Sequence, residues 1–182
     1  MHGEGCVECG ACGFEHYSNP APAVSALVLD EAGRLLLARR AVEPDIGLWD
    51  TLGGFLEEGE DAVAGLEREL REEAGVEIEV GAFVGTFPDR YGDAEDAPPN
   101  LNIVWEASIV SGTPTPHDDV AELRWFGPGE LPSEEELAFR WLGPALSEWA
   151  ERRLQRPSPE RPRAGEPALR LGEGEGEASN KN

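Results

Sequence analysis

Carboxylates crowd one short segment of the chain, and their spacing indicates what chemistry they could do. The segment from Gly54 to Val76 has the sequence GFLEEGEDAVAGLERELREEAGV, which is a glycine turn, an acidic stretch and a helix. On a helix that advances about 100° per residue, Glu69, Glu72 and Glu73 spread over roughly 100° of one side. Two unit charges about 4 Å apart repel by ~4 kcal/mol at an effective dielectric near 20. A cluster of this kind therefore favours bound cations.

The ligand type in this cluster indicates which cation and which reaction. Oxygen-only ligands suit Mg²⁺ or Mn²⁺, whereas zinc prefers nitrogen and sulfur. Such ions can bridge carboxylate and phosphate oxygens, polarise the phosphorus and lower the pKa of bound water. The pattern therefore predicts hydrolysis of a diphosphate linkage. The alternative is a solvated helix face, on which Arg68 with Glu72, or Glu69 with Arg71, would form surface ion pairs.

The apolar pattern predicts that the carboxylates lie on a helix from about Asp61 to Ala74. Spacings of three and four residues give it one apolar stripe for a core. The stripe consists of Val63, Leu66, Leu70 and Ala74. Gly75 follows as a C-cap. The stripe can pack against a sheet while the carboxylates border a cleft beside it.

Short apolar runs between turn residues predict the strands of that sheet. Strands are expected at Ala23 to Leu29, Arg34 to Arg40, Leu48 to Leu52, Val76 to Phe87, Leu101 to Val110 and Val120 to Phe126. The strand at Leu48 should stop at Gly53-Gly54, where the backbone is free to bend. Strands interleaved with two helices predict an α+β fold, in which helices cover a mixed sheet.

The second helix is predicted to open at Ser133, because Glu136 completes a capping box with it. Its apolar side would carry Leu137, Leu142, Leu146 and Trp149. A kink is expected at Gly143-Pro144, since proline interrupts helical hydrogen bonding.

Composition divides the chain into three parts. Residues 1–20 form a cysteine-bearing arm, residues 21–154 the folded domain, and residues 155–182 a tail rich in Pro, Gly, Glu and Arg. The tail has too few large apolar groups to offset its chain entropy, so we expect it to be disordered.

The formal net charge is −22, and the excess lies on residues 1–154 because charges balance in the tail. Such a body repels nucleic-acid phosphates, so no nucleic-acid partner is expected. No apolar run approaches the ~20 residues of a membrane span, and the first residues do not form a secretory signal. A cytoplasmic location without a membrane partner is the expectation.

The acidic segment resembles the Nudix box, G-x5-E-x7-R-E-U-x-E-E-x-G-U with U aliphatic. The defined positions are filled by Gly54, Glu60, Arg68, Glu69, Leu70, Glu72, Glu73, Gly75 and Val76. The resemblance extends over roughly residues 9–150, through Gly47-x-Trp49 and the Arg124-Trp125-Phe126 strand. One departure is Thr51-Leu52, where relatives often have Leu-Pro. The resemblance implies an α/β/α sandwich and a hydrolase of phosphoric anhydrides.

The resemblance also implies roles for the box residues. Glu69, Glu72 and Glu73 would be metal ligands and catalytic carboxylates, and the carbonyl oxygen of Gly54 an additional ligand. Glu69 would orient or deprotonate the attacking water. Arg68 would support the loop by pairing with Glu60 or Glu57.

Residues outside the box are candidates for further roles. The family commonly recruits another acid, for which Glu122 is our first choice, ahead of Asp118 and Asp119; acids also crowd the loop at 93–96. Tyr91 could stack on a base, and Arg39 and Arg40 could clamp phosphate. The alternative for each is an ordinary surface or strand-end residue.

The arm resembles the second knuckle of the zinc ribbon that precedes some Nudix domains. Three thiols, Cys6, Cys9 and Cys12, together with His16 or His2, could bind Zn²⁺ at short range. Ribbons use four cysteines in two pairs, so a vestigial ribbon without zinc is the preferred interpretation. An odd number of cysteines argues against a disulfide framework.

The resemblance leaves several functions open. The leading one is hydrolysis of a nucleoside diphosphate linked to another group, such as ADP-ribose or a nucleotide sugar. NADH-type relatives carry a Ser-Gln-Pro-Trp-Pro-Phe-Pro-Ser array after the box, which residues 76–91 lack. The alternatives are hydrolysis of oxidised nucleoside triphosphates and a non-catalytic nucleotide-sensing module. Many relatives dimerise, so a homodimer is a further expectation.

Overall fold

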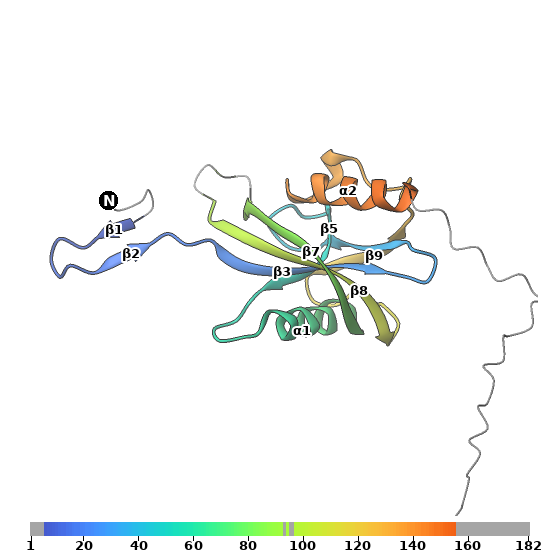
Figure 1. The fold of residues 1–182 in the computed structure, drawn as a ribbon, viewed down its shortest axis with the longest axis horizontal. Coiled ribbons are helices and arrows are strands. Elements are labelled where there is room, and N and C mark those ends of the chain that lie inside the picture. Colours follow the sequence, from blue (N-terminus) through green and yellow to red (C-terminus); the bar gives the residue numbers. More distant parts are fainter. Residues whose placement is uncertain (1–5, 93, 95–96, 156–182) are drawn as a thin grey trace, which may run out of the picture.

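The computed structural model describes residues 6–92, 94 and 97–155. Figure 1 shows three layers, with a sheet between helix α1 (Ala62–Ala74) on one face and helix α2 (Leu142–Gln155) on the other. The strands are β1 (Cys6–Glu8), β2 (Glu15–Tyr17), β3 (Ala21–Leu29), β4 (Leu35–Arg40), β5 (Trp49–Asp50), β6 (Leu52–Phe55), β7 (Glu77–Arg90), β8 (Pro99–Ser111) and β9 (Val120–Phe126). The predicted mixed sheet with helices on both faces is confirmed.

The main sheet has seven strands within the described residues, in the order β5-β4-β3-β8-β7. Strand β6 also pairs with β3, and β9 with β4. Strands β3 and β8 run parallel, whereas the other pairs are antiparallel. Strand β3 pairs with β4 only at Val28 and Leu29, and nearer its start it pairs with β6 instead. The sheet therefore divides between β5, which pairs with β4, and β6, which pairs with β3. Residues at this division line the candidate site.

Two hydrophobic clusters hold the layers together, one on each face of the sheet. Leu66, Leu70 and Ala74 of α1 are fully buried against residues of β3, β4 and β6. Val63, which was predicted to share this stripe, lies in the first turn of α1 and remains 37% exposed. On the other face, α2 packs its apolar side chains over the sheet. These are Leu142, Ala145, Leu146, Trp149 and Ala150.

Two predicted boundaries were wrong. The Ser133 capping box exists, but it opens only the short 3₁₀ turn at Glu134–Glu136, and α2 begins at Leu142. Pro144 therefore lies in the first turn of α2, where the proline's missing N–H costs no helical hydrogen bond.

The other wrong boundary lies at the glycine pair. Strand β6 does not stop at Gly53 but continues through Gly54 to Phe55. A Cβ at Gly53, whose φ is 143°, would collide with the carbonyl oxygen of Val24. The first glycine thus permits close approach of two paired strands instead of ending one.

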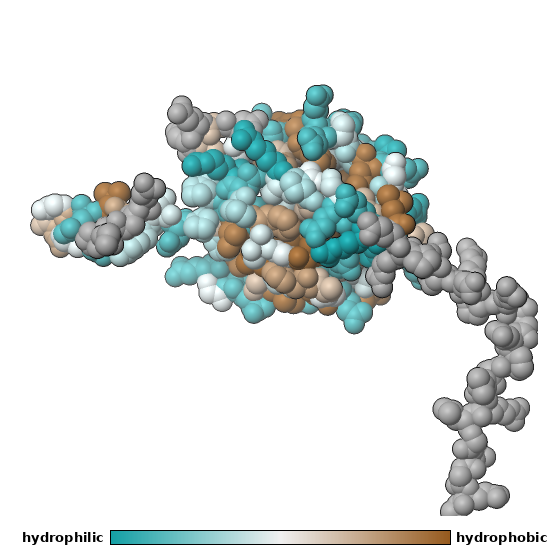
Figure 2. All heavy atoms as spheres, turned by 45° about the horizontal axis from the view of Figure 1, so that its top comes forward, coloured by the Kyte–Doolittle hydropathy of each residue, from teal (hydrophilic) through white to brown (hydrophobic). Residues whose placement is uncertain are grey.

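The arm is a hairpin in which β1 and β2 form their own two-stranded sheet. Figure 2 shows this hairpin standing clear of the domain body. The disordered tail was predicted at 155–182; Gln155 instead ends α2, and residues 156–182 lie outside the described residues. Within the part of the chain that the structure describes, no helix is long and apolar enough to cross a membrane.

Candidate active site

The helix that carries the box carboxylates, α1, is capped at both ends, and Glu69 and Glu73 on it contact the glycines of β6. The Asp61 side chain accepts hydrogen bonds from the backbone N–H groups of Val63 (2.9 Å) and Ala64 (3.3 Å), which makes it the N-cap. Gly75 adopts φ 66° and ends the helix, as the sequence predicts.

Arg68 joins the box into one network. Its Nε donates to Glu60 Oε1 (2.8 Å) and a terminal nitrogen donates to Glu60 Oε2 (3.0 Å), a bidentate pair. The predicted support role of Arg68 therefore has Glu60 as its partner, whereas Glu57 contributes its backbone N–H to the same carboxylate (2.9 Å). Arg68 also donates to Glu69 (2.9 Å) and Glu72 (3.0 Å). This arginine partly offsets the repulsion between the carboxylates.

These pairs shift the pKa values of the support residues. Hydrogen bonding to Arg68 lowers the pKa of Glu60 to about 2, and the Glu57 N–H adds to the effect. The hydrogen bond to Glu60 raises the pKa of Arg68, so both partners stay charged at every physiological pH. The loop is therefore held by a permanent ion pair.

The glycine pair of β6 receives the two inner carboxylates. Glu73 Oε2 accepts a hydrogen bond from the Gly53 N–H (2.8 Å), and the Glu73 residue is only 8% exposed. A Cβ on Gly54 would occupy the space of the Glu69 carboxylate. The absence of a side chain at Gly54 thus lets Glu69 lie directly against the backbone that supplies the predicted carbonyl ligand.

Burial and like charges raise the pKa values of these two acids. Burial raises the pKa of Glu73 well above its ordinary value; the Gly53 hydrogen bond opposes the shift, and Asp119 adds to it. Burial likewise raises the pKa of Glu69, against the opposing hydrogen bond from Arg68. Buried carboxylates that repel each other bind a proton or a cation more readily.

The loop between β8 and β9 brings an acid from outside the box to these glutamates. The backbone N–H of Thr115 donates to the Ala74 carbonyl (3.1 Å), and that of His117 to the Glu73 carbonyl (2.9 Å). These bonds satisfy carbonyls at the end of α1 that lack helical partners. The Asp119 carbonyl accepts from the Ala41 N–H (2.7 Å), so the loop is tied to both elements and Asp119 lines the cleft.

Glu122, our first choice among the acids outside the box, is not brought to this cleft. It lies opposite Arg39 in the β4–β9 register, and its carboxylate pairs with Arg39 (3.4 Å). Arg39 also lies over the Trp49 ring (5.7 Å), which belongs to the core on the α2 face. Strand alternation thus turns Glu122 and Arg39 away from the box, whereas the other two candidate acids, Asp118 and Asp119, line the cleft.

Arg40 and Tyr91 do line the cleft, but Arg40 is already engaged. It donates to the Pro44 carbonyl (2.7 Å), to Asp50 (3.2 Å) and to the Tyr91 hydroxyl (3.1 Å). Its side chain is 11% exposed, and its guanidinium lies over the rings of Tyr91 and Phe139. Burial raises the pKa of Asp50 to about 6, although Arg40 opposes the shift. This cluster organises an aromatic wall, in which Tyr91 and Phe139 stack at 5.6 Å.

The cleft has a volume of about 360 Å³ and is lined by residues from both hydrophobic clusters of the domain, the one under α1 and the one under α2. Its α1 side carries Glu69 and Glu73, and its α2 side carries Trp141 with the aromatic wall. Asn100 and Asn102 of β8 are buried in it. The sequence analysis did not identify either asparagine, although two polar residues at alternate positions of a buried strand were the available signal.

The donors on the α1 side fit a hard divalent cation. Every predicted ligand offers oxygen, and the space beside Gly54 that a Cβ would fill holds the Glu69 carboxylate. As the side chains stand, no three or more His, Cys, Asp or Glu residues in the described ranges come together in a metal-holding group. Glu69 and Glu72 are paired with Arg68, whereas Glu73 accepts its hydrogen bond from the Gly53 N–H.

The predicted zinc ligands of the arm are gathered only in part, because the Cys9 and Cys12 side chains are hydrogen-bonded to each other. Cys6, Cys9 and Cys12 are free thiols, and among the described residues they do not join His16 in a metal-holding group. In the hairpin register Cys6 lies opposite Tyr17 and His16 opposite Val7. Adjacent positions of a strand face opposite ways, so Cys6 and His16 diverge. His2 lies outside the described residues.

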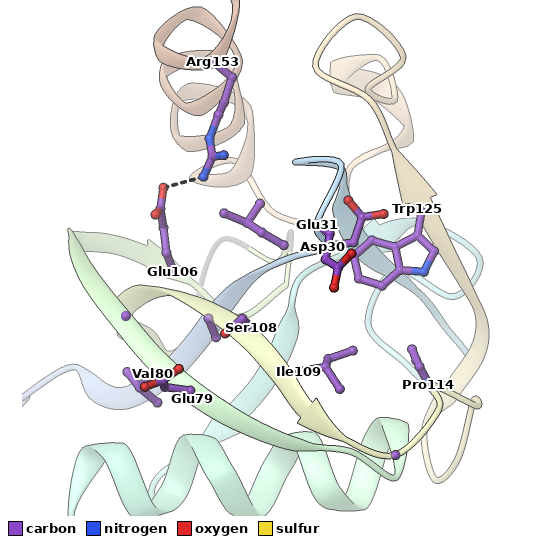
Figure 3. A pocket seen from close by; sticks show the side chains of 14 residues that line it. Asp30, Glu31, Glu79, Val80, Glu106, Ser108, Ile109, Pro114, Trp125 and Arg153 are labelled. Carbon is purple, nitrogen blue, oxygen red and sulfur yellow. Dashed lines mark hydrogen bonds and ion pairs between the residues drawn. The ribbon is translucent and has the colours of Figure 1, made fainter. Parts of the chain in front are cut away.

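A larger cavity of about 610 Å³ lies elsewhere, beside β7, β8 and the end of α2. Figure 3 shows Trp125, several acids and Arg153, which pairs with Glu106 (3.4 Å). None of the box carboxylates lines this cavity. The smaller cleft, where the buried carboxylates converge, is therefore the candidate site.

The sequence matches known proteins over most of its length. The family model described as NUDIX domain matches residues 19–147. The NAD-capped RNA hydrolase NudC of Stutzerimonas stutzeri is 31% identical over 160 residues, which are 86% of this chain and 54% of the relative. The chain thus spans about half the length of the curated relatives it matches.

Solved structures share the fold. A NUDIX hydrolase from Nitrosomonas europaea superposes with a TM-score of 0.67 at 27% identity, covering 81% of this chain and 79% of that one. The MutT NUDIX hydrolase of Burkholderia pseudomallei gives 0.62 at 26% identity, covering 70% of this chain and 96% of that one.

Proposed function

The chain belongs to the NUDIX family, and from that membership we propose that it hydrolyses the diphosphate linkage of a nucleoside diphosphate derivative. The observation that carries the proposal is the convergence of Glu69, Glu73 and Asp119 on one cleft that also has an aromatic wall. The carboxylates would act at the diphosphate, and the wall would hold a flat group attached to it.

The chain's own residues divide the work at the diphosphate. Mg²⁺ or Mn²⁺, held by Glu69, Glu72, Glu73 and the Gly54 carbonyl oxygen, would polarise the phosphorus and lower the pKa of bound water. Glu69 would orient or deprotonate the attacking water, because it lines the cleft and burial raises its pKa above the ordinary value. Arg68 keeps Glu69 in place and does not itself react.

The group on the far side of the diphosphate is proposed to be small, as in ADP-ribose or a nucleotide sugar. The curated relatives are named for NAD-capped RNA, but residues 76–91 lack the array expected of NADH-type members. The net charge of −22 also disfavours a long nucleic-acid chain. Free NAD and NAD-capped RNA therefore belong in the test as competing substrates.

The test is a substrate panel with the purified 182-residue protein and Mg²⁺, in which chromatography separates and quantifies the nucleotide products. The panel contains ADP-ribose, nucleotide sugars, NAD, NAD-capped RNA and oxidised nucleoside triphosphates. We expect cleavage of the diphosphate derivatives, whereas cleavage of triphosphates alone would establish the alternative function. Binding without turnover on any member would identify a nucleotide-sensing module.

A matched pair of variants links turnover to the box. Glu69→Gln should reduce kcat by about 10²–10³-fold, because it removes the charge that activates water. Glu67→Gln makes the same change two residues away, outside the defined box positions, and should keep wild-type turnover. Equal activity of both variants would refute the assigned role of Glu69.

A further inference from the structure

Asn100 carries a buried oxygen without a hydrogen-bond partner. The residue is 5% exposed and lines the cleft. Its Oδ1 and the Nε1 of Trp149 are the buried side-chain polar atoms, among the described residues, that find no partner. Leaving such a group unpaired costs about 1–3 kcal/mol, so its position in the cleft calls for a functional explanation.

Neighbouring hydrogen bonds fix which atom of the Asn100 amide is left over. Asn102 Nδ2 donates to the Phe87 carbonyl (3.2 Å), and that carbonyl can only accept. Asn102 therefore presents its Oδ1, which accepts from Asn100 Nδ2 (3.3 Å). The chain of bonds runs from a backbone carbonyl to Asn100 and leaves Asn100 Oδ1 as a free acceptor. A ligand that meets this atom must bring an N–H or O–H donor.

The surroundings of Asn100 suit a flat group. Asn100, Asn102 and Val104 lie at every second position of β8 and therefore share one face of the strand. Val104 belongs to the core on the α2 face, so the two asparagines also face the α2 side. The cleft on that side is also lined by Tyr91, Phe139 and Trp141. Aromatic rings give a ligand apolar contact area and ring-on-ring contacts. The box carboxylates approach from α1, on the opposite face of the sheet.

We propose that Asn100 is the specificity residue of a base subsite, in which its Oδ1 accepts a hydrogen bond from the amino group of a purine. The inference rests on the proposed function, because the box would act on the diphosphate attached to that purine. A sugar hydroxyl offers the same donor chemistry, but the aromatic wall favours a planar ring over a puckered one. Asn102 is a positioning residue, since it acts by orienting Asn100.

Equilibrium binding tests the subsite without requiring turnover. Calorimetry compares two matched pairs on the wild type: AMP against purine riboside 5′-monophosphate, which lacks the 6-amino group, and GMP against IMP, which lacks the 2-amino group. At least one amino-bearing member should bind about tenfold more tightly, as expected for one hydrogen bond. Because binding is measured directly, this result stands even if the substrate panel shows no hydrolysis.

The variant Asn100→Leu removes the acceptor and keeps an apolar side chain of similar size. Its expected binding ratio within the discriminating pair is about one. Trp149→Phe is the control: it removes the other unpaired buried polar atom, which lies in the α2 core and does not line the cleft. This control should keep the tenfold preference, and melting curves of both variants establish that they fold.

Three outcomes would overturn the proposal. The wild type could bind both members of each pair equally, in which case the Asn100 amide serves only the fold. The tighter binding of the amino-bearing nucleotide could persist in Asn100→Leu, which would mean that another residue accepts the hydrogen bond from the amino group. Finally, 2′-deoxy-AMP could lose affinity where purine riboside monophosphate does not, which would assign the donor to the sugar.

Discussion

The two sides of the cleft are built in different ways. The α1 side comes from one continuous segment, in which Gly54, Glu69 and Glu73 lie within twenty residues. The α2 side is assembled from the end of β4, the segment after β7, the start of β8 and the turn before α2. The first side is therefore visible in residue spacing, whereas the second exists only after the strands have paired. A site built from contiguous residues can be predicted from the sequence, whereas a site assembled by packing requires the tertiary structure.

After the Glu69 substitution, the largest expected effect contrasts two acids that lie close together in the sequence. Asp119→Asn should lower kcat by about 100-fold, because it removes a charge beside Glu69 and Glu73. Glu122→Gln should change kcat less than about twofold and stability by no more than about 0.5 kcal/mol, because its pair with Arg39 is half exposed. Steady-state kinetics with a substrate from the panel checks both. Equal losses in the two variants would contradict the placement of Glu122 outside the site.

A smaller effect is expected at the glycine that receives Glu69. Gly54→Ala places a methyl group where the Glu69 carboxylate lies, so the carboxylate must move. We expect kcat to fall by about tenfold and the protein to lose about 1–3 kcal/mol of stability. Gly129→Ala, where an added Cβ meets no atom within 4 Å, is the control and should behave as wild type. A Gly54→Ala variant with full activity would show that Glu69 needs no such space.

The smallest effect concerns stability and pH. The folded pKa of Glu60 is lowered to about 2 from an ordinary value of 4.5, so its pair with Arg68 stabilises the protein at pH values above about 4.5. That contribution is lost as the pH falls from 4.5 toward 2. Urea unfolding should show Glu60→Gln less stable than wild type at pH 7, with a difference that narrows below pH 4.5. A difference independent of pH would mean that the ion pair contributes nothing.

The fold was largely predictable where the pattern is local. The α1 helix has the predicted bounds to within one residue, because Asp61, Gly75 and the apolar stripe define it without outside help. The Ser133 capping box was also real, yet the chain after it makes only one turn. Leu137 leaves the turn in extended conformation and pairs with Trp49 of β5. That contact between distant segments overrides the local helical signal.

The sequence by itself determined the acidic helix, its caps and the family, because those depend on residues a few positions apart. The tertiary structure alone decided that Asp119 and not Glu122 lines the cleft, since loop hydrogen bonds to α1 and to Ala41 place Asp119, whereas the β4–β9 register turns Glu122 toward Arg39. It also decided that Arg40 holds the aromatic wall and that Asn100 keeps a free acceptor in the cleft. Both depend on hydrogen bonds between strands, and the energies of those bonds exist only once the sheet has formed.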